Sequence, residues 1–283
     1  MAIWQIEAGG FSEDWDGAWK YGILAHPAAH SLSPPMQQAA LDADGIDAAF
    51  QRYDIPPQNL SGFLKTVRDE PINGLAVSIP HKEAIIPLLD RLTPTAQAIG
   101  AVNTVFWEDE RLLGENTDAP GFWQAIASAE QAASIRSALI MGAGGTARAM
   151  VSALREQGIA VTVANRTPAK ADALAAEFGA QTVAMESAAA AGFDLVANAT
   201  SVGLLSDESP VQQEFWQGFA GIAFDAVYTP KLTTFLADAQ KAGATIVTGD
   251  EMLLQQGALQ FEIWTGKTAP LGVMRAALQK ALA

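Results

Sequence analysis

Residues 137–147 read Ser-Ala-Leu-Ile-Met-Gly-Ala-Gly-Gly-Thr-Ala, and this stretch decides the fold of the chain. An apolar strand over 137–141 runs into the pattern Gly142-x-Gly144-x-x-Ala147, which opens a helix. In that order, Gly142 permits a tight turn, Gly144 lets the backbone approach a pyrophosphate, and Ala147 keeps the helix close to the sheet. The helix N-terminus adds free N–H donors for the anion. A glycine turn without a ligand is the alternative to a dinucleotide site. The expected site residues are Gly142, Ala143, Gly144, Gly145 and Thr146.

The end of the next expected strand indicates which dinucleotide binds. A site for NAD carries an acidic residue there, which accepts hydrogen bonds from the ribose hydroxyls. The strand over 160–164 instead continues into Asn165, Arg166 and Thr167, and Lys170 follows. An arginine suits the 2′-phosphate of NADP, so we expect these four residues to bind NADP. Solvated Arg and Lys side chains at a helix start are the alternative.

Composition indicates a globular protein and excludes several functions. Apolar residues make up 49% of the 283 residues and charged residues 17%, which excludes a disordered chain. The formal charge of −14 argues against a nucleic-acid or membrane surface, and the absence of cysteine excludes disulfides and thiolate sites. Residues 1–16 lack the basic start and apolar core of a signal peptide, and no apolar run reaches the ~18 residues of a membrane span. We therefore expect a cytoplasmic protein.

Hydrophobic periodicity predicts strands and helices that alternate along the chain. In the first third the expected strands are 19–25, 48–55 and 74–79, and the expected helices are 34–44, 60–68 and 82–90. A hairpin of 101–107 and 111–114 closes this part. The middle third alternates over 137–141, 147–157, 160–164, 169–178, 182–185, 194–197 and 222–226, and the tail from 251 is helical with breaks near Gly266 and Pro270. This pattern predicts an α/β fold of two domains, the second a doubly wound parallel sheet.

Several short polar stretches beside backbone breaks carry a resemblance to a known family. They are His30-Ser31-Leu32-Ser33-Pro34, Ser78-Ile79-Pro80-His81-Lys82, Ala101-Val102-Asn103-Thr104, and Asn116-Thr117-Asp118 followed by Gly121-Phe122. With the glycine loop, Asn165-Arg166-Thr167 and Asn198-Ala199-Thr200-Ser201-x-Gly203, they resemble shikimate dehydrogenases. The resemblance keeps the same order from about Tyr21 to Gln256, which is nearly the whole chain.

The resemblance implies a fold and an activity, the reversible NADP-dependent reduction of 3-dehydroshikimate to shikimate in aromatic amino-acid biosynthesis. It implies an N-terminal α/β substrate domain, residues 1–117 plus 249–283, and a Rossmann-type doubly wound NADP-binding domain, residues 118–248. Lys82 is then the catalytic proton carrier, with Asp118 hydrogen-bonded to it. The implied substrate-binding residues are Ser31, Ser33, Ser78, Asn103, Tyr228 and Gln256, while Ala226 and Gly249 join the cofactor-binding set. A monomer or a homodimer is expected.

The residue types also fit this chemistry without the resemblance. Oxidation of a secondary alcohol requires a positioned acceptor for the hydroxyl proton, and Lys82 or Asp118 can serve. Ser31 and Ser33 stand just before a helix, so their hydroxyls and its N–H groups can hold a carboxylate without a basic patch. For each residue there is a plainer alternative, namely solvation of the lysine, capping by the aspartate, and an ordinary N-cap at Ser33.

Departures from the family pattern leave other functions open. Ala76 stands where the family commonly has Asn and Ser78 where it has Thr, so oxidation of quinate or a related polyol acid is the nearest alternative. His81 replaces the usual aromatic residue beside Lys82, and we expect it to line the cleft or face solvent, since three scattered histidines do not form a metal site. A catalytically silent NADP-binding sensor is a third interpretation. A Schiff-base enzyme would use Lys82 but explains neither the glycine loop nor Asp118.

Overall fold

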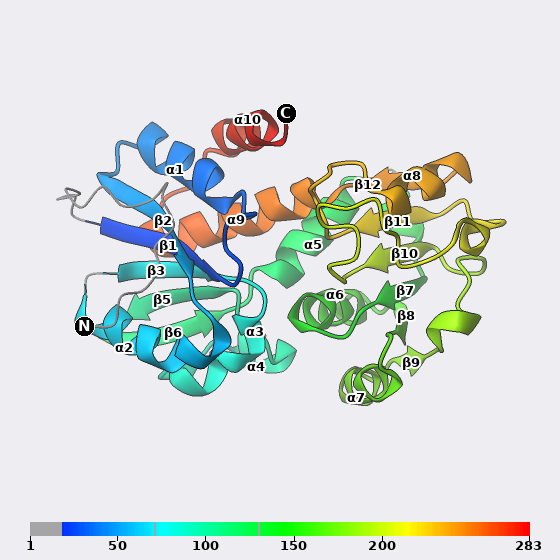
Figure 1. Ribbon diagram of the computed structural model, residues 1–283, viewed down its shortest axis with the longest axis horizontal. Helices are drawn as coiled ribbons and strands as arrows, with labels where there is room; N and C mark the ends of the chain where they lie inside the picture. The colour runs from blue at the N-terminus through cyan, green and yellow to red at the C-terminus, as the bar shows by residue number, and fades with distance from the viewer. Residues whose placement is uncertain (1–18, 71, 130) are drawn as a thin grey trace. The chain divides into compact units, whose positions relative to one another are not determined.

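The computed structural model describes residues 19–70, 72–129 and 131–283 (Figure 1). The expected absence of a signal peptide concerns residues 1–16, which lie outside the described residues. The chain forms two compact units: the first extends to Thr117 and also holds Gly257–Ala281, and the second is Asp118–Gln256. The second division falls inside helix α9, Gly249–Thr265, whereas the family resemblance implies a boundary at the first residue of this helix. A continuous helix carries no turn signal, so the pattern of residues could not mark the point.

The first unit is built on a mixed sheet of strand order β2-β1-β3-β5-β6-β4 (Figure 1). Its strands are β1 Trp19–Ala25, β2 Ala48–Asp54, β3 Ile72–Val77, β4 Arg91–Leu92, β5 Thr104–Glu108 and β6 Arg111–Glu115. Its helices are α1 Ser33–Ala43, α2 Leu60–Asp69, α3 His81–Ala84, α4 Pro94–Ile99, most of α9, and α10 Leu271–Leu282. Strand β1 pairs in parallel with β2 and β3, whereas β5 is antiparallel to both β3 and β6. The predicted hairpin is therefore present as β5–β6.

Helices cover both faces of this sheet because its strands are apolar on both sides. Helix α2 buries Phe63, Leu64 and Val67 at helical spacing against one face, in a cluster that includes Leu24 and Leu75. Helix α9 lies on the opposite face: the Trp264 ring contacts Tyr21 and Phe50, and its Nε1 donates to the Val105 carbonyl at 3.0 Å. Neighbouring residues of a strand point to opposite faces of the sheet, so the strand residues that contact α2 differ from those that contact α9. Helices α2 and α9 therefore pack on the two faces of β1 and β3.

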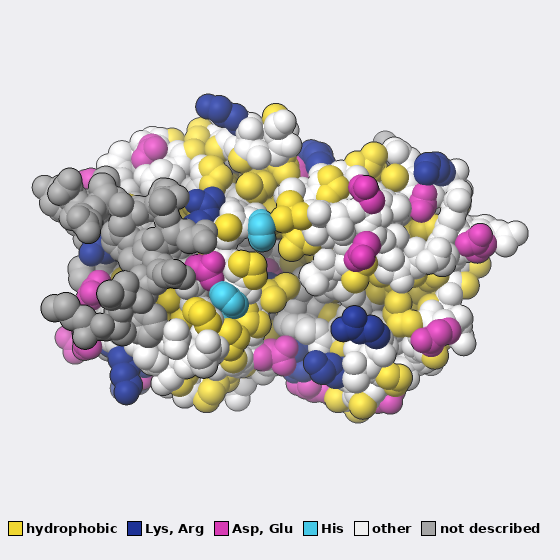
Figure 2. Space-filling model, in the orientation of Figure 1, with side chains coloured by type: hydrophobic (Ala, Val, Ile, Leu, Met, Phe, Trp, Pro, Cys, Tyr) yellow, Lys and Arg dark blue, Asp and Glu magenta, His cyan; other side chains and the backbone are white. Residues whose placement is uncertain are grey.

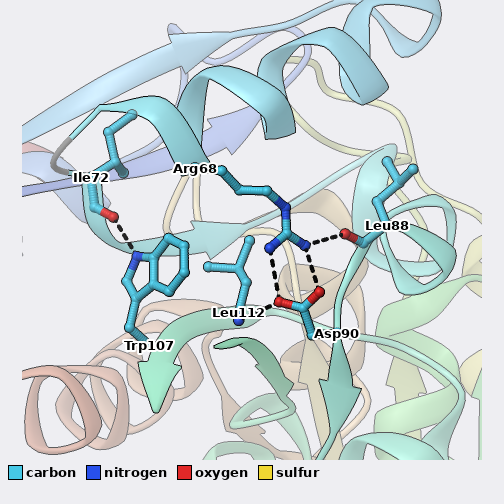
Figure 3. Close-up of polar contacts among 6 residues, drawn as sticks. All are labelled: Arg68, Ile72, Leu88, Asp90, Trp107 and Leu112. Atoms are coloured by element: carbon cyan, nitrogen blue, oxygen red, sulfur yellow. Dashed lines mark hydrogen bonds and ion pairs between the residues drawn. The ribbon is translucent and has the colours of Figure 1, made fainter. Parts of the chain in front are cut away.

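The helix predicted over 82–90 is wrong in its second half. Helix α3 ends at Ala84, and a 3-10 turn, Ile86–Leu88, follows, because Pro87 has no N–H to continue the helix. The segment is then tied down by Asp90, whose carboxylate accepts from Arg68 Nη1 at 2.8 Å and Nη2 at 3.0 Å and from the Leu112 N–H at 2.7 Å (Figure 3). Hydrogen bonds from Arg68 lower the pKa of Asp90.

The second unit is a six-stranded sheet with strand order β12-β11-β10-β7-β8-β9, in which every described pair is parallel (Figure 1). Its strands are β7 Ser137–Met141, β8 Ala160–Ala164, β9 Gln181–Thr182, β10 Leu195–Asn198, β11 Ile222–Asp225 and β12 Thr245–Val247. Its helices are α5 Asp118–Ala127, α6 Gly145–Glu156, α7 Pro168–Phe178, α8 Thr234–Lys241 and the start of α9. The chain leaves β7 toward β8 and returns to β10 on its other side, which is the doubly wound order expected from residues 137–147.

One predicted strand of this unit is largely absent. The segment 182–185 contributes only Thr182 to β9, and Met185 begins a 3-10 turn. Val183 and Met185 pack instead against the buried cluster around Trp216 and Phe235, so their apolar character serves the core and not a strand.

Two features of the described residues concern nucleic-acid and membrane binding, namely the distribution of basic side chains on the surface and the length of the apolar helices. Figure 2 shows the Lys and Arg side chains of one face as small separate groups among acidic and uncharged side chains. Among the described residues, no helix is both long and apolar enough to span a bilayer.

Candidate active site

The glycine loop connects β7 to α6 in the second unit. Gly142 has φ +116°, and a Cβ there would lie 3.1 Å from the carbonyl of Ala199, so both conformation and packing require glycine. Gly144 is the residue before α6, and no side chain caps that helix. The first N–H groups of α6 are thus turned toward the carboxyl edge of the sheet.

Space around Gly144 supports a ligand at this edge. A Cβ built on Gly144 meets no atom within 4 Å, so nothing in the protein's own packing requires glycine at this position. Gly144 differs from other glycines with open Cβ positions, such as Gly272, because it lies between the end of β7 and the N-terminus of α6, where a pyrophosphate would approach the backbone. The loop therefore fits a dinucleotide better than the alternative of a ligand-free turn.

The next βα connection carries the residues expected at the adenosine ribose. Helix α7 begins after Thr167, whose carbonyl accepts from Asn165 Nδ2 at 3.0 Å. Arg166, Thr167 and Lys170 are all exposed. The sheet register pairs Met141 at the end of β7 with Ala164 at the end of β8, so this turn adjoins the glycine loop.

The two serines of the first unit lie at the start of α1, and the plainer alternative, in which Ser33 is an ordinary N-cap, is wrong. Ser33 is the first helical residue, and its N–H donates to Ser31 Oγ at 3.2 Å, so Ser31 supplies the hydroxyl at this helix start. Two residues of β2 hold the preceding loop. Arg52 Nη2 donates to the Ser31 carbonyl at 3.1 Å, and Asp54 accepts from the Ala28 N–H at 3.2 Å.

Lys82 lies on the short helix α3, half-buried, and its main chain is fixed by a neighbouring stretch. The Val102 N–H donates to the Lys82 carbonyl at 2.7 Å, and the Val77 N–H donates to the Asn103 carbonyl at 2.7 Å. The structure therefore brings the Ser78, Lys82 and Asn103 stretches together at one edge of the first sheet.

The expectation for His81 is wrong, because its side chain is fully buried and neither lines a cleft nor faces solvent. Its Nε2 lies 2.7 Å from the carbonyl of Ile55, just beyond β2. Burial lowers the pKa of His81, which keeps the ring neutral. His81 is therefore a core residue next to Lys82 in the sequence and not a candidate proton carrier.

Asn103 lies in a buried polar network with Thr117, the last residue of this part of the first unit. Its Nδ2 donates to Thr117 Oγ1 at 2.9 Å, and its Oδ1 accepts from the Thr117 N–H at 2.7 Å. Gln260 of α9 adds a hydrogen bond to the Asn103 carbonyl at 2.9 Å. Asp118 follows directly as the first residue of α5 and is 4% exposed.

In the second unit, α5 and α9 approach closely beside Asp118. A Cβ on Gly121 would lie 2.7 Å from Cβ of Gln256, so the absence of a side chain at Gly121 allows this packing. Gln256 Nε2 donates to the Leu253 carbonyl at 2.9 Å. Asp118 and Gln256 therefore stand on two helices in contact.

The remaining predicted residues follow β11. Ala226 donates its N–H to the Asn198 carbonyl at 2.9 Å, which ties it to the end of β10. A Cβ on Gly249 would lie 2.7 Å from the Ala226 carbonyl, so packing alone accounts for this glycine. Tyr228 is half-buried two residues beyond Ala226.

Sequence reasoning missed Asp225, the last residue of β11, which is completely buried. Burial raises the pKa of its carboxyl to about 7, although hydrogen bonds from Thr233, Val227 and Asn198 favour the ionised form. An aspartate that ends an apolar strand next to the predicted Ala226 is the signal that could have found it. Among the described residues, no cluster of three His, Asp or Glu side chains could hold a metal ion.

The raised pKa of Asp225 predicts a pH-dependent stability. The folded chain keeps this proton more tightly than the unfolded chain, so its stabilising effect is complete below about pH 4 and is lost as pH rises through about 7. Between about pH 5 and 8 the free energy of unfolding of the wild type should fall by about 3 kcal/mol more than that of Asp225→Asn, in which residue 225 does not titrate. Chemical unfolding of both proteins across this range measures the difference. Parallel curves would contradict the prediction.

Comparison with known proteins places this chain in a family. The profile of the shikimate dehydrogenase substrate binding domain matches residues 23–105, that of shikimate / quinate 5-dehydrogenase 125–206, and that of the shikimate 5′-dehydrogenase C-terminal domain 249–279. The chain is 42% identical over 268 residues to the shikimate dehydrogenase (NADP(+)) of Oleidesulfovibrio alaskensis, which covers 93% of this chain and 95% of that protein.

Solved structures show the same relationship. The shikimate 5-dehydrogenase of Thermus thermophilus, in complex with NADP(H) and shikimate, is 43% identical with a TM-score of 0.84, covering 93% of this chain and all of that one. The quinate dehydrogenase of Corynebacterium glutamicum, in complex with NAD, is 27% identical with a TM-score of 0.82, covering 92% of this chain and 98% of that one. The chain belongs to the shikimate dehydrogenase family.

Proposed function

We propose that the chain is an NADP-dependent shikimate dehydrogenase, which reversibly reduces 3-dehydroshikimate to shikimate on the route to aromatic amino acids. The observation that carries this proposal is the open space at Gly144, at the start of α6, which would admit the cofactor. In the other unit, a main-chain hydrogen bond joins Lys82 to the stretch that contains Asn103. Residues 118–248 form the NADP-binding domain of this proposal, and residues 1–117 with 249–283 form the substrate domain.

The substrate residues divide by the groups that they would bind. Ser31, Ser33 and the N-terminal N–H groups of α1 suit the carboxylate, because hydroxyl and amide donors hold an anion without a buried lysine or arginine. The ring hydroxyls and the keto group would meet both donors and acceptors. The side chains proposed for them are Ser78, Asn103, Tyr228 and Gln256.

The proton chemistry belongs to Lys82 and Asp118. The nicotinamide, when bound, supplies the hydride to the keto carbon and takes it back in the reverse direction. The Lys82 ammonium gives a proton to the oxygen on that carbon during reduction and recovers it from the hydroxyl during oxidation. Asp118 would accept a hydrogen bond from this ammonium and orient it.

The cofactor residues fit NADP better than NAD. Gly142, Ala143, Gly144, Gly145 and Thr146 would surround the pyrophosphate, Asn165, Arg166, Thr167 and Lys170 the 2′-phosphate, and Ala226 and Gly249 the nicotinamide half. Arg166 is exposed just beyond the end of β8, where the sequence supplies no acidic residue between 160 and 170 to compete for its guanidinium.

Replacing Arg166 by Ala should reduce the preference for NADP. A charged hydrogen bond to phosphate is lost, so kcat/KM for NADP⁺ should fall by about 10- to 100-fold while that for NAD⁺ changes little. Steady-state rates with both cofactors measure the ratio. Lys241→Ala removes an exposed cation of α8 and serves as the control. An equal loss with both cofactors would refute the role of Arg166.

The experiment that tests the activity is turnover of 3-dehydroshikimate with NADPH by the purified chain, with the product identified by mass spectrometry. We expect shikimate in amounts equal to the NADPH consumed, and no turnover would contradict the proposal. Quinate oxidation remains the second candidate only because Ala76 and Ser78 alter the family pattern. A cytoplasmic location, where NADP(H) is held, and a monomeric or homodimeric state complete the proposal.

A further inference from the structure

Asp225 has a buried carboxylate that the proposed chemistry does not use. Its Oδ1 accepts from Asn198 Nδ2 at 2.9 Å and from the Val227 N–H at 2.9 Å, and its Oδ2 accepts from Thr233 Oγ1 at 2.6 Å. Asp225, Asn198 and Thr233 each have no exposed surface. Such a carboxylate is costly to bury, and its three donors come from separate parts of the second unit.

The first donor, Asn198, organises the loop after β10. Its Oδ1 accepts from the Thr200 N–H at 3.0 Å and from Thr200 Oγ1 at 2.7 Å, while its Nδ2 also donates to the Val202 carbonyl at 3.2 Å. The Val202 N–H in turn donates to Thr200 Oγ1 at 3.1 Å. The loop is wound around one side chain, and Asp225 holds that side chain.

The other two donors fix both ends of the connection from β11 to α8. Val227 directly precedes Tyr228, so its hydrogen bond to Asp225 sets where the main chain leaves the strand. Thr233 caps α8, because its Oγ1 accepts from the Leu236 N–H at 3.3 Å while donating to Asp225. One carboxylate thus joins two loops and a helix start.

These loops lie on the nicotinamide side of the sheet. In a doubly wound fold the adenosine half of a dinucleotide lies over the first two strands, here β7 and β8, and the other half lies over the strands beyond the reversal, here β10 and β11. The Ala199 carbonyl would be 3.1 Å from a Cβ on Gly142, so the β10 loop adjoins the glycine loop.

We propose that Asp225 is a positioning residue for the nicotinamide half of the cofactor, acting through Asn198 and the main chain before Tyr228. It holds the two loops in one arrangement and has no contact with the cofactor itself. The inference rests on the proposed function, because it assigns a task to these loops only if NADP binds at this edge.

A carboxylate with a comparable set of donors lies at the opposite edge of the same sheet. Asp194 Oδ2 accepts from the N–H groups of Arg136 and Ser137 at 2.8 and 3.0 Å and from Ser137 Oγ at 3.0 Å. Its three hydrogen bonds, the same number as at Asp225, join β7 to the start of β10 at the amino edge of the sheet, although Asp194 is only half-buried. Asp194→Ala therefore measures the effect on stability of losing such a hydrogen-bond network, at an edge where no cofactor is proposed to bind.

The test compares NADP⁺ with adenosine 2′,5′-bisphosphate, which carries only the adenosine half, by calorimetric titration of the folded proteins. Asp225→Ala should weaken NADP⁺ binding at least about tenfold and leave the bisphosphate within about twofold of wild type. Its kcat with saturating shikimate and NADP⁺ should fall at least about tenfold. Asp225→Asn keeps an acceptor for Asn198 and Val227, so it should retain most of the NADP⁺ affinity and most of kcat. Asp194→Ala should lower the melting temperature and change neither of these quantities.

Three results would overturn the inference alone. The first two concern Asp225→Ala: NADP⁺ affinity and kcat within about twofold of wild type, or an equal loss of affinity for NADP⁺ and for the bisphosphate. Equal losses in Asp194→Ala would also overturn it. If Asp225→Ala does not fold, Asn198→Ser removes the β10 loop's central side chain and must show the same selective loss. A wild-type chain that binds neither ligand would instead refute the proposed function, and this inference with it.

Discussion

Lys82→Ala should lower kcat for shikimate oxidation by about three orders of magnitude, since a positioned proton carrier contributes about 10²- to 10⁴-fold. The methyl group of alanine cannot take the hydroxyl proton, and α3 brings no other lysine to this edge. The fold should persist, because the segment keeps hydrogen bonds that do not use the Lys82 side chain, namely those of the Val102 N–H to the residue 82 carbonyl and of the His81 ring to the Ile55 carbonyl. The melting temperature should therefore change little.

A surface lysine of the same unit provides the control. Lys65 is exposed on α2, and Lys65→Ala should leave kcat and KM unchanged. The measurement is kcat against pH for the wild type and both variants, with the melting temperature of each. Turnover of Lys82→Ala within about threefold of wild type would exclude Lys82 as the proton carrier.

Gly144→Val should abolish most NADP⁺ binding and leave the fold intact. The backbone at Gly144, φ −97° and ψ −174°, is extended and suits a β-branched residue, and no protein atom lies within 4 Å of the new Cβ. The valine would occupy the space that the pyrophosphate requires, so the NADP⁺ dissociation constant should rise at least about 100-fold. Calorimetric titration and a thermal melt measure the two effects separately.

Two other glycines make this prediction specific. Gly272 in α10 also has open space around its Cβ position, and Gly272→Val should change neither NADP⁺ binding nor turnover. Gly142→Ala should instead lower the melting temperature, because φ +116° and the nearby Ala199 carbonyl oppose any side chain. Normal NADP⁺ affinity of Gly144→Val would mean that the glycine loop does not hold the pyrophosphate.

Much of the fold was predictable from the sequence where local signals agree. The β7–α6 connection combines an apolar strand, glycines and a helix, and it appears as predicted. The β5–β6 hairpin was recognisable from the charged turn between two apolar runs. The apolar pattern over 82–90 predicts a single helix, which Pro87 interrupts, and Met185 is apolar because it packs against the core and not because it lies in a strand. Both errors arise because hydrophobicity reports burial and does not by itself identify the element.

For the candidate site, the sequence predicted residue types better than their environments. Motifs indicate Lys82 and Asn103, but only the structure shows the main-chain hydrogen bonds that join their stretches. His81 was misread because nothing in its neighbours shows that the ring turns to the Ile55 carbonyl. Asp225 escaped notice because its three donors lie 2, 8 and 27 residues away along the chain. Pairings over such separations are set by the fold and leave no local pattern.

The most direct test of the central claim is kcat/KM of the purified chain for shikimate and for quinate, each with NADP⁺ and with NAD⁺. We predict that kcat/KM for shikimate with NADP⁺ exceeds the other three combinations by at least about tenfold, because Arg166 would bind the 2′-phosphate that NAD⁺ lacks and the proposed substrate residues would suit shikimate. A higher value for quinate with NAD⁺ would contradict it and would make Ala76 and its surroundings the determinant of specificity. No reduction of either cofactor in any combination would leave the chain as a silent NADP-binding protein.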